Sequence, residues 1–225
     1  MEKTLQGRMS PRPLEVDDRR LAPRRWFDVP LALLALLLLS PVMVAAALAV
    51  RLTSKGPVLF RQTRIGRGER PFAMLKFRSM YVDADDRADR EANRRELMGE
   101  AAPTGPDGLF RAEHDPRITP AGRFMRPLSI DELPQLFNVL RGEMAMVGPR
   151  PSLPWEVEMF TARQRGRHAC PPGLTGLWQV SGRNRLSMAE MLELDLDYVA
   201  RRSLWLDIKL LARTPAAVLF DRNTR

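Results

Sequence analysis

The chain has 225 residues, with 36 Lys and Arg, 27 Asp and Glu and a formal net charge of +9. This length suits one domain with a core and a membrane element, and it argues against two full globular domains. The basic balance favours anionic partners such as nucleic acid, anionic lipid or phosphorylated molecules. One cysteine and two histidines exclude a disulfide framework and a zinc site of soft ligands, so a metal ion here would be hard and oxygen-bound, such as Mg²⁺.

The N-terminal part divides into a polar tail and an apolar segment. Residues 1–23 are rich in Arg, Pro and acidic residues without an apolar period, which predicts a mobile tail. No residue from Val29 to Val50 is charged, and seven of the nine residues 31–39 are leucine. On insertion scales this leucine run favours entry into a bilayer by roughly 3 to 4 kcal/mol. We therefore expect residues 24–52 to form a membrane helix.

Ser40 and Pro41 interrupt this helix and predict a kink. Pro41 has no amide hydrogen, so the carbonyl of Leu37 loses its helical partner, and Ser40 is placed to bind that carbonyl. The leg from Val29 to Ser40 would rise about 18 Å, which is close to half of a hydrocarbon core about 30 Å thick. The break would therefore lie near the bilayer midplane.

Both flanks of the apolar segment are basic, with Arg19, Arg20, Arg24 and Arg25 before it and Arg51, Lys55, Arg61, Arg64 and Arg67 after it. The positive-inside rule would keep both ends in the cytoplasm, which favours a helix that enters, bends and leaves by the same face. A single kinked span is the simpler alternative. A cleaved export signal is a third reading, because the Arg24-Arg25 pair and the alanines at 45–47 resemble its two ends.

The rest of the chain alternates short strands and helices. Two apolar runs around a glycine-containing turn, 57–62 and 71–77, predict a small β-hairpin. Apolar or charged helical patterns cover 82–98, the stretch after Ser129, 188–200 and 203–220, whose Trp205, Lys209 and Arg213 suit an interfacial helix. Residues 99–108 are rich in Gly and Pro and predict a loop. The expected fold class is α+β and mainly helical, with amphipathic interfacial helices.

The adjacent carboxylates Asp131 and Glu132 are the sharpest chemical feature. Ser129 and Glu132 have the spacing of a capping box, so a purely structural role at a helix start explains them. The same helix start would favour an ionised Asp131, which can attack phosphorus or hold magnesium. The two readings are compatible, and Asp131 is the candidate for both nucleophile and metal ligand.

Several cations and turns could bind phosphate around these carboxylates. Pro149 and Pro151 fix the backbone on either side of Arg150, which lowers the entropy lost when its guanidinium grips a phosphate. A rigid loop with a solvated arginine is the alternative. Further candidates, each with a structural alternative, are Lys76 and Arg78 after the second strand, and Gln179 and Arg183 beside the glycine-rich turn 172–176.

The ordered set of motifs resembles the bacterial sugar transferase family, the monotopic phosphoglycosyl transferases. The set comprises Arg25, Asp28, Ser40-Pro41, Ser54-Lys55-Gly56-Pro57, Gln62, KFRSM (76–80), SIDELPQLFNVLRGEM (129–144), VGPRP (147–151), PGLTGLWQVSGR (172–183) and Asp197-Tyr198. The likeness runs from about Arg24 to Thr214. It implies a monotopic membrane protein with a re-entrant kinked helix, residues 24–52, and a catalytic domain, residues 53–225. Relatives with a large multi-span N-terminal half exist, and this sequence resembles the compact catalytic form.

The resemblance also implies an activity. Asp131 would be the nucleophile and a magnesium ligand, Glu132 its partner acid or base, and Arg126 a further substrate-binding residue. The reaction would move a sugar 1-phosphate from a UDP-sugar to polyprenyl phosphate at the cytoplasmic face of a bacterial inner membrane, with release of UMP. This would initiate exopolysaccharide, O-antigen or glycan assembly. We expect no nucleic-acid partner, and the oligomeric state stays open, a homodimer included.

Two positions depart from the family pattern: Pro127 replaces a second basic residue after Arg126, and Glu143-Met144-Ala145 replaces the usual Asp-Met-Ser. These changes affect minor contacts and leave Asp131 and Glu132 in place. The sequence does not select among glucose, galactose and an acetamido sugar. A catalytically silent membrane adaptor, which would bind anions in a salt-sensitive way without turnover, is the rival function.

Overall fold

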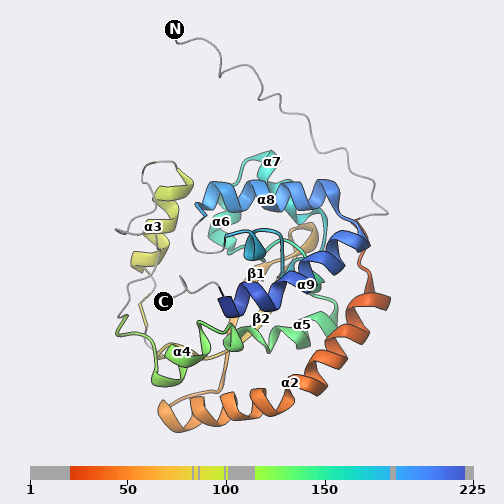
Figure 1. The fold of residues 1–225 in the computed structure, drawn as a ribbon. Coiled ribbons are helices and arrows are strands. Elements are labelled where there is room, and N and C mark those ends of the chain that lie inside the picture. The colour runs from red at the N-terminus through yellow and green to blue at the C-terminus, as the bar shows by residue number, and fades with distance from the viewer. Residues whose placement is uncertain are drawn as a thin grey trace.

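The computed structural model describes residues 21–82, 84–85, 87–98, 100, 115–182 and 186–220. Residues 1–20 of the predicted tail and most of the predicted loop lie outside them, whereas Leu21, which the tail prediction included, is buried in the core. The fold is mainly helical with a few short strands, as the sequence predicts. Figure 1 shows α2 along one edge, α4 and α5 beside it, the hairpin β1–β2 in the middle, and α8 on the far side. The elements are α2 (Arg25–Thr53), β1 (Leu59–Ile65), η1 (Arg67–Glu69), β2 (Pro71–Phe77), α3 (Arg87–Leu97), α4 (Pro120–Met125), η2 (Ile130–Glu132), α5 (Gln135–Arg141), β3 (Ala145–Val147), α6 (Pro154–Met159), α7 (Ala162–Arg165), η3 (Gly166–Ala169), β4 (Gly173–Thr175), η4 (Trp178–Val180), α8 (Met188–Arg201) and α9 (Leu204–Phe220).

Helix α2 is bent, and Figure 1 shows its first and second halves running in different directions. The carbonyl of Leu37, which loses its helical partner at Pro41, is bound as predicted: Ser40 Oγ donates a hydrogen bond to it at 2.9 Å. Within the described residues, α2 is the one helix that is long and apolar enough to cross a membrane. Most of its apolar face is uncovered, with Leu33, Leu34, Leu37, Leu38, Val44, Leu48 and Leu52 all more than half exposed.

The first end of α2 is clamped onto the rest of the fold. Arg25 donates from Nη1 to the Val139 carbonyl and from Nη2 to the Leu140 carbonyl, each at 2.8 Å, at the end of α5. The buried Asp28 accepts a hydrogen bond from the Met146 backbone N–H at 2.9 Å, next to the core. These contacts join the start of the apolar helix to α5 and β3.

The second end of α2 is clamped as well, by Arg78. This buried side chain donates from Nη1 to the Lys55 carbonyl at 2.6 Å and from Nη2 to the carbonyl and hydroxyl of Ser54 at 2.8 Å. A Cβ at Gly56 would lie 2.0 Å from Arg78 Nη1, so the guanidinium reaches these carbonyls because position 56 is glycine. Both ends of the apolar helix are therefore attached to one folded body.

Two apolar clusters run along α2. Its first half contributes Leu31, Ala32, Ala35 and Leu36 to a cluster with α5, β3, α8 and α9, and its second half contributes Met43, Ala46, Ala47, Ala49 and Val50 to a cluster with β2, α4 and η2. The helix thus packs against the domain along its whole length on one face. Its opposite face carries the exposed leucines described above.

The predicted hairpin is confirmed, although its first strand lies at Leu59–Ile65 and not at 57–62. Strands β1 and β2 pair antiparallel from Leu59 opposite Phe77 to Ile65 opposite Pro71. Asn138 of α5, which is fully buried, joins this hairpin to the helix layer: its Oδ1 accepts from the Leu75 N–H at 3.0 Å and its Nδ2 donates to the Ala73 carbonyl at 2.8 Å. The hairpin cannot slide along α5 without breaking both bonds.

A second, parallel pair of short strands was missed by the sequence analysis, which predicted a glycine-rich turn at residues 172–176. Strand β3 pairs with β4, with Ala145 opposite Gly173 and Val147 opposite Thr175. A Cβ on Gly173 would lie 2.0 Å from the Gly148 nitrogen. The glycines therefore permit a close backbone approach of two strands that are each three residues long, too short to show an alternating pattern.

Two helix predictions need correction at their starts. The charged helix predicted for 82–98 is α3, which begins at Arg87. The helix predicted after Ser129 begins at Gln135, as α5. By contrast, α8 begins as expected, with Ser187 and Glu190 forming a capping box, and α9 covers the predicted interfacial helix with Trp205 75 % exposed.

Candidate functional site

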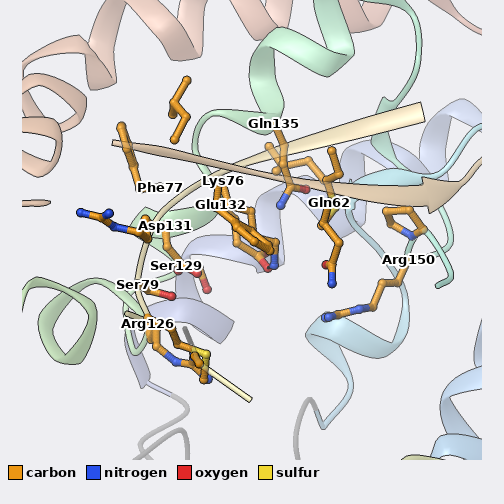
Figure 2. A pocket seen from close by; sticks show the side chains of 18 of the residues that line it. Gln62, Lys76, Phe77, Ser79, Arg126, Ser129, Asp131, Glu132, Gln135 and Arg150 are labelled. Carbon is orange, nitrogen blue, oxygen red and sulfur yellow. Dashed lines mark hydrogen bonds and ion pairs between the residues drawn. The ribbon is translucent and has the colours of Figure 1, made fainter. Parts of the chain in front are cut away.

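A cavity of about 580 Å³ opens between the hairpin, η2, the loop at 149–151 and η4. Asp131, Glu132, Lys76, Arg126 and Arg150 all line it. Figure 2 shows Arg126 and Arg150 entering from opposite sides, with Lys76 and Glu132 between them. The fold therefore brings together carboxylates and cations that lie up to 74 positions apart in the sequence, between Lys76 and Arg150.

The turn that carries the carboxylates differs from the predicted capped helix start. Ser129 has a φ of 53°, in the left-handed region, and its side chain makes no capping hydrogen bond. Asp131 and Glu132 lie in the 3₁₀ turn η2 rather than in α5. A non-glycine residue in this conformation costs of order 1 to 3 kcal/mol, and such strain is concentrated at functional sites.

The position of this turn places Asp131 close to the apolar helix. Ile130, its neighbour, packs into the same cluster as Ala46 and Val50 of α2. Asp131 itself is 8 % exposed and lines the cavity. The carboxylate is thus buried at the cavity wall, one residue from a contact with the apolar helix.

Glu132 is held by a cation from the hairpin. Lys76 Nζ lies 2.7 Å from Glu132 Oε1, and both side chains are mostly covered. Burial lowers the pKa of Lys76, while the charge of Glu132 opposes that shift and favours the ammonium form. Because β2 is fixed to α5 through Asn138, the lysine is delivered to the carboxylate by a rigid element.

Arg78 lines the same cavity, but its terminal nitrogens bind the carbonyls at the end of α2 described above. The structure therefore gives this residue an anchoring contact in addition to its place in the cavity wall.

Glu143, one of the departures from the family pattern, accepts a hydrogen bond from Asn138 Nδ2 at 2.7 Å. Its carboxylate thus supports the residue that fixes the hairpin.

The loop that carries Arg150 is held from beneath by a buried ion pair. Arg167 pairs with Asp195 of α8, and it donates to the Arg150 carbonyl at 2.8 Å and to the Ser152 hydroxyl at 2.9 Å. Arg167 and Asp195 are 6 % and 1 % exposed. The Arg150 guanidinium carbon itself lies 5.8 Å from the centre of the Trp178 ring, in a cation–π contact.

The two prolines of this loop occupy different places. Pro151 lines the cavity, and its carbonyl accepts a hydrogen bond from Arg64 Nη1 at 3.1 Å. The Pro149 carbonyl accepts from the Gly173 N–H at 2.9 Å, which joins the loop to β4. The loop is therefore fixed by contacts on both sides of Arg150, in addition to the restricted proline backbone.

The remaining predicted site residue that the structure describes is Gln179, which lines the cavity, while Arg183 lies outside the described residues. The sequence analysis did not select Gln62 and Gln135 as site residues, yet both line the cavity. Gln135 follows Asp131 by four residues and is 3 % exposed. The signal for Gln135 was its spacing from the carboxylate, since η2 and α5 place both side chains on the cavity side.

The carboxylates of the cavity fit one of the two usual kinds of Mg²⁺ site. Among the residues that the structure describes, no group of three or more His, Cys, Asp or Glu side chains is placed to hold a metal ion. Magnesium is nevertheless commonly bound by one or two carboxylates that are supplemented by substrate phosphates and water. Asp131 and Glu132 at the wall of a cation-lined cavity fit that second kind of site.

Comparisons with known proteins give the family. The sequence model described as "Bacterial sugar transferase" matches residues 19–221. The chain is 41 % identical over 206 residues to "Galactosyl transferase CpsE" of Streptococcus agalactiae, covering 91 % of this chain and 44 % of that protein. It is 40 % identical over 208 residues to "UDP-glucose:undecaprenyl-phosphate glucose-1-phosphate transferase" of Caulobacter vibrioides, covering 89 % and 71 %. It is 39 % identical over 207 residues to "Exopolysaccharide production protein ExoY" of Rhizobium meliloti, covering 89 % and 87 %.

The chain therefore spans less than half of the Streptococcus protein and most of the other two. The match extends through every element that lines the cavity. On this evidence, the chain belongs to the bacterial sugar transferase family.

Proposed function

We propose that this chain transfers a sugar 1-phosphate from a UDP-sugar to polyprenyl phosphate and releases UMP. The observation that carries the proposal is the buried Asp131 in a cavity that also presents Lys76, Arg126 and Arg150, one residue from the apolar helix. The cations would neutralise the charge of a diphosphate donor. The adjacent apolar helix would place the site within reach of a lipid acceptor. The printed name of the Caulobacter relative joins the same two substrates.

In the first step, a carboxylate oxygen of Asp131 attacks the sugar-bearing phosphorus. The bond from that phosphorus to the bridging oxygen breaks, UMP leaves with the electron pair, and a phosphosugar remains on the carboxylate. In the second step, an oxygen of polyprenyl phosphate attacks the same phosphorus and Asp131 leaves as a carboxylate. Two steps allow one site to handle a soluble donor and a lipid acceptor in turn.

The cations around the cavity would stabilise the phosphate charge as it moves to the leaving group. Arg126 and Arg150 are placed to bind the diphosphate, and Arg150 is held in place by Arg167 below its carbonyl. Glu132, kept close by Lys76, would be the partner acid or base. A bound Mg²⁺, with Asp131 as its protein ligand, would supply further neutralisation of phosphate charge.

We infer further that α2 is re-entrant. Its two ends are clamped to the same domain by Arg25 and Asp28 at one end and Arg78 at the other, and its whole length packs on that domain. A helix that crossed the bilayer would separate these ends. This geometry supports an active site on the cytoplasmic face of the inner membrane, where the basic flanks favour both ends.

The test is a UMP-release assay on protein in nanodiscs with Mg²⁺, polyprenyl phosphate and a panel of UDP-sugars. We expect release with at least one donor and its loss in Asp131→Asn, which keeps the size of the side chain. Asp85→Asn is the matched control, because that carboxylate is exposed and pairs with Arg87. Full UMP release by Asp131→Asn would refute the nucleophile, and salt-sensitive lipid binding without release would favour an adaptor.

A further inference from the structure

A second cavity, of about 490 Å³, lies next to the carboxylate cavity. It is bounded by α3, α6, α8 and residues 115–117. The two cavities share a wall made of Met80, Arg126, Arg150, Pro151 and Trp178. The two arginines proposed to bind the donor diphosphate therefore border both spaces, so a molecule whose phosphates lay on this wall would extend into each of them.

Among the residues that line this second cavity, three buried side-chain atoms have no hydrogen-bond partner within the described part of the chain: Glu96 Oε2, Trp178 Nε1 and Arg167 Nε. Glu96 and Trp178 are 8 % and 6 % exposed. Glu96 Oε2 accepts hydrogen bonds, whereas Trp178 Nε1 and Arg167 Nε donate them. Leaving such a group unsatisfied costs about 1 to 3 kcal/mol, so Glu96 Oε2 and Trp178 Nε1 are candidates for ligand contacts.

Glu96 is held in position by the rest of the fold. Its other oxygen, Oε1, accepts a hydrogen bond from the Met188 backbone N–H at the first turn of α8. Burial raises the pKa of the Glu96 carboxyl, since that single hydrogen bond offsets only part of the desolvation. The side chain thus has one oxygen fixed by α8 and a second, buried oxygen with no hydrogen-bond partner among the described residues, in a residue that lines the cavity.

We propose that the second cavity binds the nucleoside of a nucleoside diphosphate sugar. The diphosphate would then lie along Arg126 and Arg150, and the sugar-bearing phosphorus would face Asp131 in the first cavity. Glu96 would accept a hydrogen bond from a base N–H or a ribose hydroxyl, and the Trp178 indole N–H would donate to a base carbonyl. This assignment rests on the proposed function and adds a recognition site to it.

The cavity offers contacts for both parts of a nucleotide. Its five arginines, Arg64, Arg117, Arg126, Arg150 and Arg167, suit a phosphate, whereas a phosphate dianion provides no hydrogen-bond donor for Glu96. A uracil ring and ribose, in contrast, offer both N–H or O–H donors and carbonyl acceptors. A volume of about 490 Å³ lies within the usual range for small-molecule pockets, roughly 300 to 1,000 Å³.

The inference is tested by equilibrium binding of UMP and of inorganic pyrophosphate to the full chain in detergent. We compare wild type with Glu96→Gln, which can keep the bond to the Met188 N–H, and with Trp178→Phe, which removes the donor and keeps a ring. Each variant should weaken UMP binding about tenfold, the usual effect of losing a hydrogen bond to a charged or buried group. Pyrophosphate affinity should stay within about twofold of wild type for Glu96→Gln.

Glu91→Gln is the matched control, because Glu91 lies on the same helix but is exposed and pairs with Arg95. It should leave UMP affinity unchanged. In turnover, Glu96→Gln should raise the KM for a UDP-sugar about tenfold with kcat within about threefold, as expected when binding shared by ground and transition state is lost.

The outcomes separate this inference from the proposed function. UMP release with normal UMP affinity and KM in both variants would overturn the nucleoside site and leave the transfer reaction standing. Glu96-dependent UMP binding by a protein that turns over no donor would support the site and count against the reaction. A parallel loss of pyrophosphate affinity in Glu96→Gln would contradict the site, since it would mean that the arginine wall had moved.

Discussion

Lys76 Nζ lies 2.7 Å from Glu132 Oε1, so the Glu132 carboxylate is paired with a cation of the protein. The lysine reaches it from β2, which Asn138 fixes to α5. The contact fixes the Glu132 carboxylate beside a cation of the hairpin, and it supports the proposed role of Glu132 as a positioned acid or base.

Replacement of Lys76 by Met should reduce turnover and leave the fold intact. The change removes a charged hydrogen bond worth about 1.5 to 3 kcal/mol, and we expect kcat to fall about 10- to 100-fold. Steady-state UMP release measures the effect. Lys209→Met, on the exposed face of α9, is the control and should retain activity. A Lys76→Met enzyme with kcat within twofold of wild type would refute the proposed contribution of the pair.

The ion pair of Arg167 and Asp195 should position Arg150 as well as stabilise the fold. Arg167→Met leaves Asp195 buried without its partner, which should destabilise the protein by about 3 to 5 kcal/mol. The double variant Arg167→Met with Asp195→Leu should recover most of that stability. It should still show a raised KM for the donor, because the Arg150 carbonyl loses its hydrogen bond.

Thermal unfolding and steady-state kinetics on the two Arg167 variants separate these effects. A double variant with wild-type KM would show that the buried pair serves stability alone. A double variant as unstable as Arg167→Met would contradict the assumption that the cost comes from an unpaired charge.

The sequence predicted the elements with strong local signals and missed those that depend on contacts between distant segments. The hairpin, the break at Ser40-Pro41 and the helix that begins at Met188 follow from local residue patterns, and the structure confirms them. The β3–β4 pair depends on the close approach of Gly148 and Gly173, which lie 25 positions apart. No local sequence pattern predicts this pairing.

The candidate site shows the same division. Asp131 and Arg150 were recognisable from their neighbours in sequence, and the fold brings them to one cavity. The anchoring contacts of Arg78 and the support of Arg150 by Arg167 could not be foreseen, because each joins segments that only tertiary packing brings together. The predicted capping by Ser129 was wrong because that residue adopts the left-handed conformation, in which its side chain makes no capping bond.

A cysteine-labelling experiment tests the re-entrant helix. We predict that Pro23→Cys and Lys55→Cys, at exposed positions before and after α2, react with a membrane-impermeant maleimide from the same side of oriented vesicles. Wild type is the control background, since burial raises the pKa of the Cys170 thiol to about 12 and keeps it unreactive. Labelling of the two positions from opposite sides would show that α2 crosses the bilayer.

Acid should destabilise the protein partly through His168. Burial lowers its pKa to about 4 from an ordinary value of 6.5, so the unfolded chain binds the extra proton between these values. Stability from the neutral ring is therefore complete above about pH 6.5 and is lost as pH falls toward 4, by up to about 3 kcal/mol. His168→Gln should have a flatter stability profile over that window. Equal slopes for variant and wild type in thermal unfolding would contradict this assignment.

The covalent step is tested most directly by intact-mass spectrometry of the protein after incubation with a UDP-sugar and Mg²⁺ but no lipid acceptor. The account predicts a mass increase of one phosphosugar, mapped to Asp131 after proteolysis, which disappears when polyprenyl phosphate is added and is absent from Asp131→Asn. Sustained turnover with both substrates, together with an unmodified Asp131 in the donor-only sample, would contradict it.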